Sequence, residues 1–444
     1  MAMRAAAKGS NLTWSRSSCM SPDPTQQMHD VAVIGGGIVG LSAALELQSR
    51  GRLVIVIDPD DEYRRASYGN AGVLSRGSIL PVAGPGIWNN FFRYARNADP
   101  AVRLRYSSLP ALWPWLRRFL RAANQQAQRD SAAILNPLVE AAFARHIALG
   151  EIAGTIPLIH RDGWLRLYRS DTNLAGIALE REILGEHGVE TELLSGEAIY
   201  ELEPFLARRY AHGLLFTQTG SVQSPGEVVR RFTAAFRARG GKFLKGSATG
   251  LRQTATGVDV RTRDGVVHAG HAVVSAGAWS GGLLRELGYR IPLASERGYH
   301  AHYRLREGAS LGRAINDTSA GFVVAPMNGE VRLLTGVELC RPDDPPRPRQ
   351  LDLAAMEAAR TLPLGEAAGP VWSGNRPSTP DSLPVIGLAP NHDRVVLAFG
   401  HGHIGFSTGP VTGDIVARLI CKERQTIPIA GFDVRRFSQS AAKQ

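Results

Sequence analysis

Apolar and polar positions near the start of the chain follow the pattern of a strand, a helix and a second strand. Residues 31–34 form an unbroken apolar run, residues 41–47 carry apolar side chains at helical spacing, and residues 53–57 form a second apolar run. Short unbroken apolar runs are typical of strands that are buried on both faces, as in a parallel sheet covered by helices. The pattern therefore predicts a βαβ unit.

Parts of this pattern return later in the chain. Residues 271–275 and 395–399 are apolar runs that end in small-residue turns, and each predicts another strand. Pro225 favours the first turn of a helix that we expect to reach residue 239, and a further helix is expected from about residue 409 to 421. Residues 1–27 are rich in Ser, Ala and Pro, and we interpret them as a disordered tail without a signal peptide.

The turn between the first strand and its helix carries the motif G-x-G-x-x-G. Gly35 permits the tight turn, Gly37 leaves room for a pyrophosphate, and Gly40 lets helix and strand pack closely. Asp58, which ends the second strand, can accept hydrogen bonds from ribose hydroxyls, and an acid at this place disfavours NADP. The unit predicts a bound dinucleotide, with its phosphates at the helix N-terminus, but it does not distinguish FAD from NAD.

Two loops favour FAD. Residues 64–72 are small and polar and follow the second strand, where an NAD-binding domain would continue to its next βαβ crossover. Such a loop suits a close approach to a pyrophosphate and a flavin ring, although a plain surface loop has the same composition. Residues 400–406 are rich in glycine and precede the last helix, whose N-terminus can stabilise negative charge on a reduced flavin.

Taken together, these motifs resemble the FAD-dependent amino-acid oxidoreductases, the superfamily of D-amino-acid oxidase, glycine oxidase and sarcosine oxidase, and its D-amino-acid dehydrogenase branch above all. The matching stretches are VAVIGGGIVGLSAALEL, ASYGNAGVL, VVSAGAW, GNRPSTPDSLPVIG and GHGHIGFSTGP, in the family's order from about residue 30 to 420. The resemblance implies an α/β fold with a Rossmann-like FAD-binding domain and a discontinuous substrate domain on a mostly antiparallel sheet. We expect the FAD-binding domain at 28–85, 218–290 and 370–440, and the substrate domain at 86–217 and 291–369.

The resemblance also implies the residues that contact FAD. In the relatives, a residue near Ala248 contacts the adenine through its backbone. The expected contacts are Gly35, Gly36, Gly37, Ile38, Val39, Gly40, Asp58, Ser67, Asn70, Ala71, Gly72, Ala248, Ala276, Gly277, Trp279, Gly402, His403, Ile404 and Gly405.

Arg376 is the leading candidate for the substrate site. The guanidinium fork matches both oxygens of a carboxylate, and the corresponding arginine of the relatives binds the substrate carboxylate. Arg297, Tyr299 and His300 form a second candidate group, because the relatives place substrate-pocket residues on the strand after this turn. No metal site is expected, since the paired histidines at 300/302 and 401/403 lack a third ligand nearby.

The resemblance implies oxidation of an amine-bearing carbon. Arg376 would hold the carboxylate, the Cα hydrogen would leave as hydride to the flavin N5, and the imine would hydrolyse to a 2-oxo acid and ammonia. The first interpretation is a D-amino-acid dehydrogenase that passes electrons to a quinone or another acceptor. The alternatives are an enzyme of a cyclic imino acid or secondary amine, such as D-hydroxyproline, sarcosine or glycine, and a membrane-associated nucleotide-binding module without catalysis.

Composition changes this picture at one segment. The net charge of +11 invites a nucleic-acid interpretation, but the basic residues are scattered and no binding motif accompanies them, so we expect no nucleic-acid partner. Residues 86–130 hold eight arginines and two aspartates, 8 − 2 = +6, together with three tryptophans and three phenylalanines. Residues 112, 116, 119 and 120 are apolar and share one helical face, while arginines 117, 118 and 121 point elsewhere.

A basic aromatic helix of this kind can lie on an anionic membrane, or it can be an ordinary helix packed on the substrate domain. No unbroken apolar run reaches the roughly 18 residues of a membrane span. The expected location is therefore the cytoplasm, with peripheral contact to the inner membrane as the alternative that residues 86–130 raise.

Overall fold

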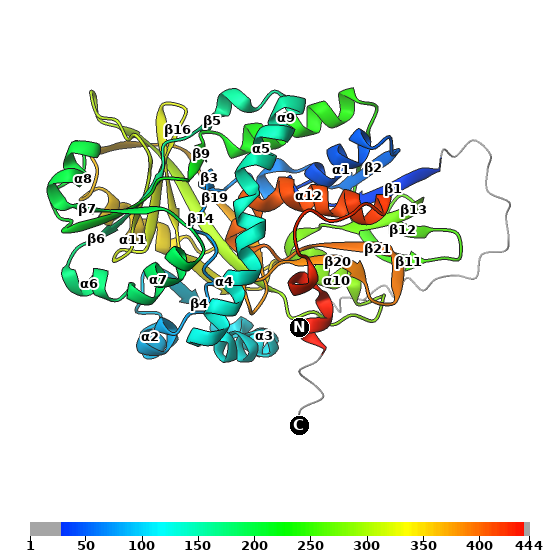
Figure 1. The fold of residues 1–444 in the computed structure, drawn as a ribbon, viewed down its shortest axis with the longest axis horizontal. Coiled ribbons are helices and arrows are strands. Elements are labelled where there is room, and N and C mark those ends of the chain that lie inside the picture. The colour runs from blue at the N-terminus through cyan, green and yellow to red at the C-terminus, as the bar shows by residue number, and fades with distance from the viewer. Residues whose placement is uncertain (1–27, 439–444) are drawn as a thin grey trace, which may run out of the picture.

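Two large sheets, one in each half of the molecule, organise the computed structural model, which describes residues 28–438 (Figure 1). The first sheet has eight strands and the second has ten. A small sheet of β3 (Val73–Leu74), β9 (Gly220–Val222) and β5 (Ile159–His160) accompanies them. The predicted tail, residues 1–27, lies outside the described residues.

The first sheet confirms the predicted βαβ unit. It consists of β1 (His29–Ile34), α1 (Ile38–Ser49) and β2 (Val54–Asp58), and β1 pairs in parallel with both β2 and β13 (Val266–Val274). The parallel part continues to β21 (His392–Phe399) on one side and to β10 (Lys242–Lys245) on the other. The antiparallel additions are β11 (Ala248–Gln253), β12 (Val258–Thr262) and β20 (Val385–Ala389).

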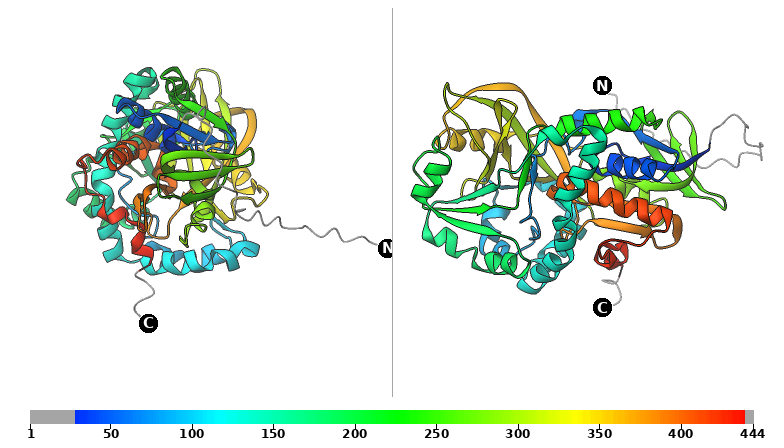
Figure 2. Two further views of the ribbon diagram at one scale, coloured as in Figure 1. Left: turned by 90° about the vertical axis from the view of Figure 1, so that its right-hand side faces the viewer. Right: turned by 45° about the horizontal axis from the view of Figure 1, so that its top comes forward.

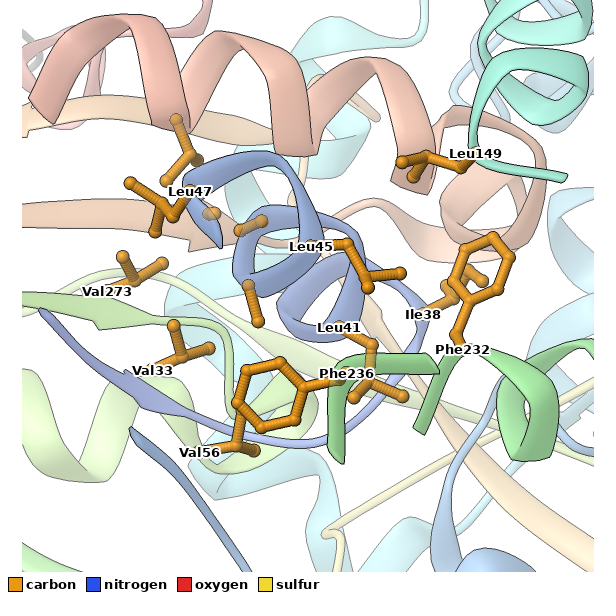
Figure 3. Packing of buried hydrophobic residues seen from close by; sticks show 14 of the residues in the cluster. Val33, Ile38, Leu41, Leu45, Leu47, Val56, Leu149, Phe232, Phe236 and Val273 are labelled. Carbon is orange, nitrogen blue, oxygen red and sulfur yellow. The ribbon is translucent and has the colours of Figure 1, made fainter. Parts of the chain in front are cut away.

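Alternate residues of these parallel strands face two separate cores. Val33, Val56 and Val273 pack against α1, with α9 (Pro225–Ala238) and α12 (Gly405–Cys421) beside it (Figure 3). Ile55 and Val274 face the other side and pack near β12. Burying one such side chain stabilises the fold by about 1.5–3 kcal/mol, which explains why the runs are apolar at every position.

The second sheet is mostly antiparallel, as expected. Seven of its nine strand pairings are antiparallel, and β19 pairs with β14 along most of its length. Position 370, the expected start of the last FAD-binding segment, lies inside β19, so this strand continues across that boundary. The strands are β4 (Val102–Leu104), β6 (Trp164–Tyr168), β7 (Thr191–Ser195), β8 (His212–Phe216), β14 (Ala294–Leu305), β15 (Ala314–Asp317), β16 (Phe322–Met327), β17 (Glu330–Thr335), β18 (Val337–Cys340) and β19 (Leu364–Ser378).

α4 and α5 lie between the two halves of the molecule, and α2 and α3 lie beneath them in Figure 1. α2 and α3 lie on the same side of the molecule (Figures 1 and 2), and Trp88 of α2 donates through Nε1 to the Ala123 carbonyl, 2.9 Å away, just after α3. α3 buries Leu112 and Trp115 against the second sheet, whereas α2 buries no residue. The remaining helices are α2 (Gly86–Ala95), α3 (Leu109–Ala122), α4 (Gln125–Glu140), α5 (Ala142–Ala153), α6 (Asp171–Ala175), α7 (Ala178–Glu186), α8 (Gly196–Leu202), α10 (Ser280–Leu284) and α11 (Arg349–Ala358).

One stretch of the described chain, Gln125–Ala153, is long enough to span a membrane, and 18 consecutive residues of it reach a mean hydropathy of 1.2. Polar residues interrupt this stretch, so it contains no unbroken apolar run of that length. In the fold this stretch is α4 and α5. It buries Leu138 and Leu149 in the core, and His146 bonds through Nε2 to the Phe406 carbonyl of α12 at 2.9 Å. These contacts are those of a helix in a folded core.

Candidate active site

A cavity of about 630 Å³ lies at the carboxyl ends of the parallel strands of the first sheet, where it meets the second sheet. Its lining includes Asp58 at the end of β2 and Ser275 after β13, and Thr335 and Arg376 from the second sheet. Ligands of open parallel sheets bind in this place, because the turns that follow the strands converge there.

The glycine motif has the geometry that its spacing predicts. Gly35 has φ +109°, and a Cβ there would lie 2.4 Å from the Ser275 carbonyl oxygen. A Cβ on Gly40 would lie 1.9 Å from the Gly35 carbonyl oxygen, so helix and turn touch. At Gly37 the nearest atom would be Ser67 Oγ at 3.7 Å, which leaves space beside the start of α1. That first turn carries no acidic residue and its N-cap residue has no side chain, so it is open to a phosphate except at the Ile38 amide, which donates to Ser67 Oγ.

Asp58 is held in place by three donors. Its Oδ2 accepts from the Gly36 amide at 2.6 Å, and its Oδ1 accepts from Arg65 and from the Asp60 amide, each at 2.8 Å. The carboxylate also lines the cavity. It therefore presents a fixed acceptor to ribose hydroxyls, as the sequence predicts.

Most of the expected FAD contacts line the cavity. Three do not: Gly36, Gly40 and Gly72. Gly72 has φ +74°, and a Cβ there would lie 2.0 Å from the Val222 carbonyl oxygen, so its glycine serves the backbone path. Those that line the cavity are Gly35, Gly37, Ile38, Val39, Asp58, Ser67, Asn70, Ala71, Ala248, Ala276, Gly277, Trp279, Gly402, His403, Ile404 and Gly405.

Arg376 lies on β19 and lines the same cavity. Its guanidinium rests on Gly298 of β14, where a Cβ would lie 2.5 Å from Nη2. Nη1 donates to the Gly336 carbonyl at 3.1 Å. Among residues 28–438, no carboxylate oxygen lies within 4.0 Å of this guanidinium. The charged fork is therefore unpaired and faces a cavity, as a carboxylate receptor requires.

Glu296 is the acidic neighbour of Arg376. It lies opposite Arg376 in the β14–β19 pairing and is 4% exposed. Burial raises the pKa of Glu296, while Ser378 and the positive charge of Arg376 oppose that shift. Burial in turn lowers the pKa of Arg376, and Glu296 raises it. No sequence motif pointed to Glu296.

Arg297 and Tyr299 face the other side of β14, because side chains of a strand alternate. Arg297 is 3% exposed and donates to the Asn375 side chain and to the Pro342 carbonyl. Tyr299 donates to Glu338, and burial followed by this contact raises its pKa to about 12. Neither residue lines the first cavity, so their positions give them no contact with a ligand bound there.

His300 is on the same face as Arg376 but lies in a different environment. It stacks on Trp372 with ring centres 4.8 Å apart, and burial lowers its pKa to about 2. It lines a second cavity of about 790 Å³, whose wall it shares with Trp372. Trp372 lines both cavities and donates through Nε1 to the Tyr63 carbonyl at 2.7 Å. His300 is therefore part of the partition between the cavities.

Several lining residues escaped the sequence analysis. They come from the second sheet and carry no shared motif, so only the fold brings them to the cavity; they are Trp164, Val323, Leu334, Thr335 and Trp372. The spacing of Trp372, Gly374 and Arg376 was a usable signal for one of them, since alternate residues of a strand share a face.

The two histidines after β21 have different roles in the fold. Both line the first cavity, but His401 is only 3% exposed and bonds to Thr412 Oγ1 at 3.0 Å, and burial lowers its pKa to about 3. His403 opens on the cavity, where surrounding protein and then Arg376 lower its pKa to about 4. Within the described part of the chain, no three His, Cys, Asp or Glu side chains lie close enough together to hold a metal ion.

Comparison with known proteins agrees with this geometry. The family model described as FAD dependent oxidoreductase (DAO) matches residues 30–419. The chain belongs to this family. A D-amino-acid oxidase of Bradyrhizobium diazoefficiens is 33% identical over 421 residues, which cover 92% of this chain and 98% of that protein. A D-amino acid dehydrogenase of Methylobacterium sp. is 29% identical and covers 93% of this chain and 100% of its own length.

Solved structures show the same fold. Glycine oxidase from Geobacillus kaustophilus superposes with a TM-score of 0.74 at 20% identity, over 92% of this chain and 99% of its own. The family match makes the chain an FAD-dependent oxidoreductase with FAD as its cofactor. The residues present fit that group: an open helix N-terminus at α1, space at Gly37, and a fixed acceptor at Asp58.

Proposed function

We propose that the protein catalyses oxidative deamination of a D-amino acid to a 2-oxo acid and ammonia, with electrons passing to a quinone or another acceptor. The observation that carries the proposal is the unpaired guanidinium of Arg376 in the wall of the cofactor cavity. The names of its relatives, D-amino-acid oxidase and D-amino acid dehydrogenase, support a D-amino acid as the substrate class.

Arg376 binds the carboxylate and so sets the position of the attached Cα. Gly298 leaves room for the guanidinium, and the Gly336 carbonyl fixes one end of the fork. The remaining N–H groups then meet two carboxylate oxygens, which fixes orientation as well as position. When bound, FAD supplies the hydride acceptor.

A substrate panel tests this proposal. Purified yellow protein under nitrogen is mixed with D-alanine, L-alanine, glycine, sarcosine and D-hydroxyproline, and flavin bleaching is followed at each concentration. Bleaching by D-alanine, with no bleaching by L-alanine, is the expected result. Bleaching by only sarcosine or D-hydroxyproline would replace the proposal with the secondary-amine alternative.

The electron acceptor is tested on the reduced enzyme. We expect a quinone analogue to reoxidise the flavin faster than dissolved oxygen does. Rapid peroxide formation in air, with no rate gained from the quinone, would make the enzyme an oxidase.

We also propose peripheral contact of a cytoplasmic protein with an anionic membrane through α2 and α3. Trp88 and Phe92 of α2 are 51% and 74% exposed, and Trp113 of α3 is 58% exposed. Arg96 and Arg117 are exposed on the same two segments. Aromatic rings beside arginines suit the interface of an anionic bilayer, where each basic residue contributes about 1 kcal/mol.

Cosedimentation with vesicles tests this contact. Phosphatidylserine-containing vesicles should bind the protein at low salt and release it at high salt, because salt screens the charges. Replacing both Trp88 and Phe92 with Ser should abolish binding while flavin content stays the same. Equal binding by this double variant would refute the role of α2.

A further inference from the structure

Arg332 belongs to β17 of the second sheet, yet its side chain reaches the loop that follows β2 in the first half of the fold. Its Nη1 donates to the Tyr68 carbonyl at 2.9 Å and to the Asn70 carbonyl at 2.6 Å. Its guanidinium also lies 5.9 Å from the centre of the Tyr68 ring. One side chain thus ties two successive turns of this loop to the sheet opposite.

His302 and Glu330 orient the Arg332 side chain through its Nε. Its Nε donates to His302 Nε2 at 3.1 Å, and His302 Nδ1 lies 3.0 Å from Glu330 Oε2. Because an arginine N–H can only donate, His302 Nε2 must be an acceptor and Nδ1–H must donate to Glu330. Burial and the charge of Arg332 lower the pKa of His302, which keeps the ring neutral as this arrangement requires.

Hydrogen bonds, not an ion pair, compensate the buried positive charge of Arg332. Arg332 is 5% exposed, and burial lowers its pKa to about 10, so the group stays charged at neutral pH. Within the described residues, no carboxylate oxygen lies within 4.0 Å of it. A buried cation without an ion pair is costly, and backbone carbonyls are what compensates it here.

The loop that Arg332 holds is part of the cofactor site. Ser67, Gly69, Asn70 and Ala71 line the first cavity. Ser67 Oγ accepts from the Ile38 amide at 3.1 Å, so the position of the loop also affects the first turn of α1. The second sheet therefore reaches the flavin loop and, through Ser67, the start of the phosphate-facing helix.

We propose that Arg332 is a positioning residue for FAD. Arg332 holds residues 67–71 in the conformation that binds the cofactor, and His302 and Glu330 orient the Arg332 side chain. The inference rests on FAD binding, not on the proposed substrate. Its test uses flavin affinity without any amino acid, so its failure and that of the proposed deamination are distinguishable.

The experiment measures FAD release from purified full-length holoprotein by ultrafiltration and flavin fluorescence. Arg332→Met should weaken FAD binding at least about tenfold, since charge-assisted hydrogen bonds to two carbonyls are lost. Arg332→Lys should restore part of that affinity, because an ammonium can still donate to the carbonyls. The visible flavin bands should also shift in Arg332→Met, as the loop beside the cofactor changes.

Arg169→Met is the matched control. Arg169 pairs with Asp317 and Glu357 of the second half and lines neither cavity, so its loss should lower the unfolding midpoint without changing FAD affinity. His302→Ala is the milder variant should Arg332→Met not fold, and we expect a threefold to tenfold loss. FAD affinity unchanged in Arg332→Met, or in His302→Ala if only that variant folds, would overturn the proposal.

Discussion

Arg376 of β19 and Arg297 of β14 lie on paired strands, one residue out of register with each other. Their side chains therefore face opposite sides of the sheet. Arg297 sits across from Asn375, the residue before Arg376, and its Nε and Nη2 donate to Asn375 and to the carbonyls of 341 and 342. It lines the second cavity and not the first. Arg376 has one carbonyl partner and a cavity in front of it. The comparison teaches that a ligand-binding arginine is distinguished by the cavity that it faces and by how few protein partners hold it.

The largest effect is expected from the loss of Arg376. Arg376→Ala should raise KM for the amino acid about 30-fold or more, since losing a buried charge pair costs about 2–5 kcal/mol. FAD content should not change. Anaerobic flavin-reduction titrations measure the effect, with Arg297→Ala as the matched control. An unaltered KM would show that another residue holds the carboxylate.

Arg297→Ala tests whether the second arginine acts on stability and not on substrate binding. We expect the free energy of unfolding to fall by about 3 kcal/mol, because several charge-assisted hydrogen bonds to buried partners are lost. KM should stay close to the wild-type value. Thermal or urea unfolding of the holoprotein measures the first quantity and flavin reduction the second. A large rise in KM with unchanged stability would reverse the roles of the two arginines.

His401 extends the comparison to a histidine that borders the first cavity but is almost fully buried. Its pKa is lowered by burial to about 3, against an ordinary value of 6.5. Below about pH 6.5 the unfolded chain takes up a proton that the folded protein does not, so stability falls with decreasing pH. The slope is about 1.4 kcal/mol per pH unit, or about 2 kcal/mol at pH 5.

Urea unfolding at pH 7 and pH 5 measures this loss. His401→Gln has no proton to take up at this site, so its stability should fall less between the two values. The buried His146 contributes a similar slope in both proteins, so only the difference between them counts. Equal slopes would mean that His401 is not kept neutral by the fold.

The smallest effect concerns Glu296, the acid opposite Arg376. Its pKa is raised by burial, and its ionisation with increasing pH should weaken carboxylate binding by about tenfold or less. Glu296→Gln should remove that part of the KM–pH profile and leave KM at low pH unchanged. A profile identical in both proteins would show that Glu296 does not influence the charge of Arg376.

Motifs that act within one turn were predictable from the sequence. The glycine turn at 35–40, Asp58 and the loop at 67–72 belong to contiguous segments, and their shape follows from local backbone geometry. The same segments carried the family resemblance, which implied the antiparallel second sheet. The residues that this sheet contributes to the cavity, such as Val323 and Leu334, were missed because ordinary core strands contain the same apolar types.

By itself, the sequence determined the βαβ unit, the dinucleotide site and the family, because each depends on neighbours a few residues apart. Tertiary structure decided which arginine faces the cavity. Arg297 and Arg376 are both flanked by small or polar residues, and only the register of β14 against β19 sets Arg376 over Gly298 and turns Arg297 away from the first cavity. Arg332 and its contact with residues 68 and 70 arise likewise from strands far apart in the chain, since pairing over such distances leaves no local pattern.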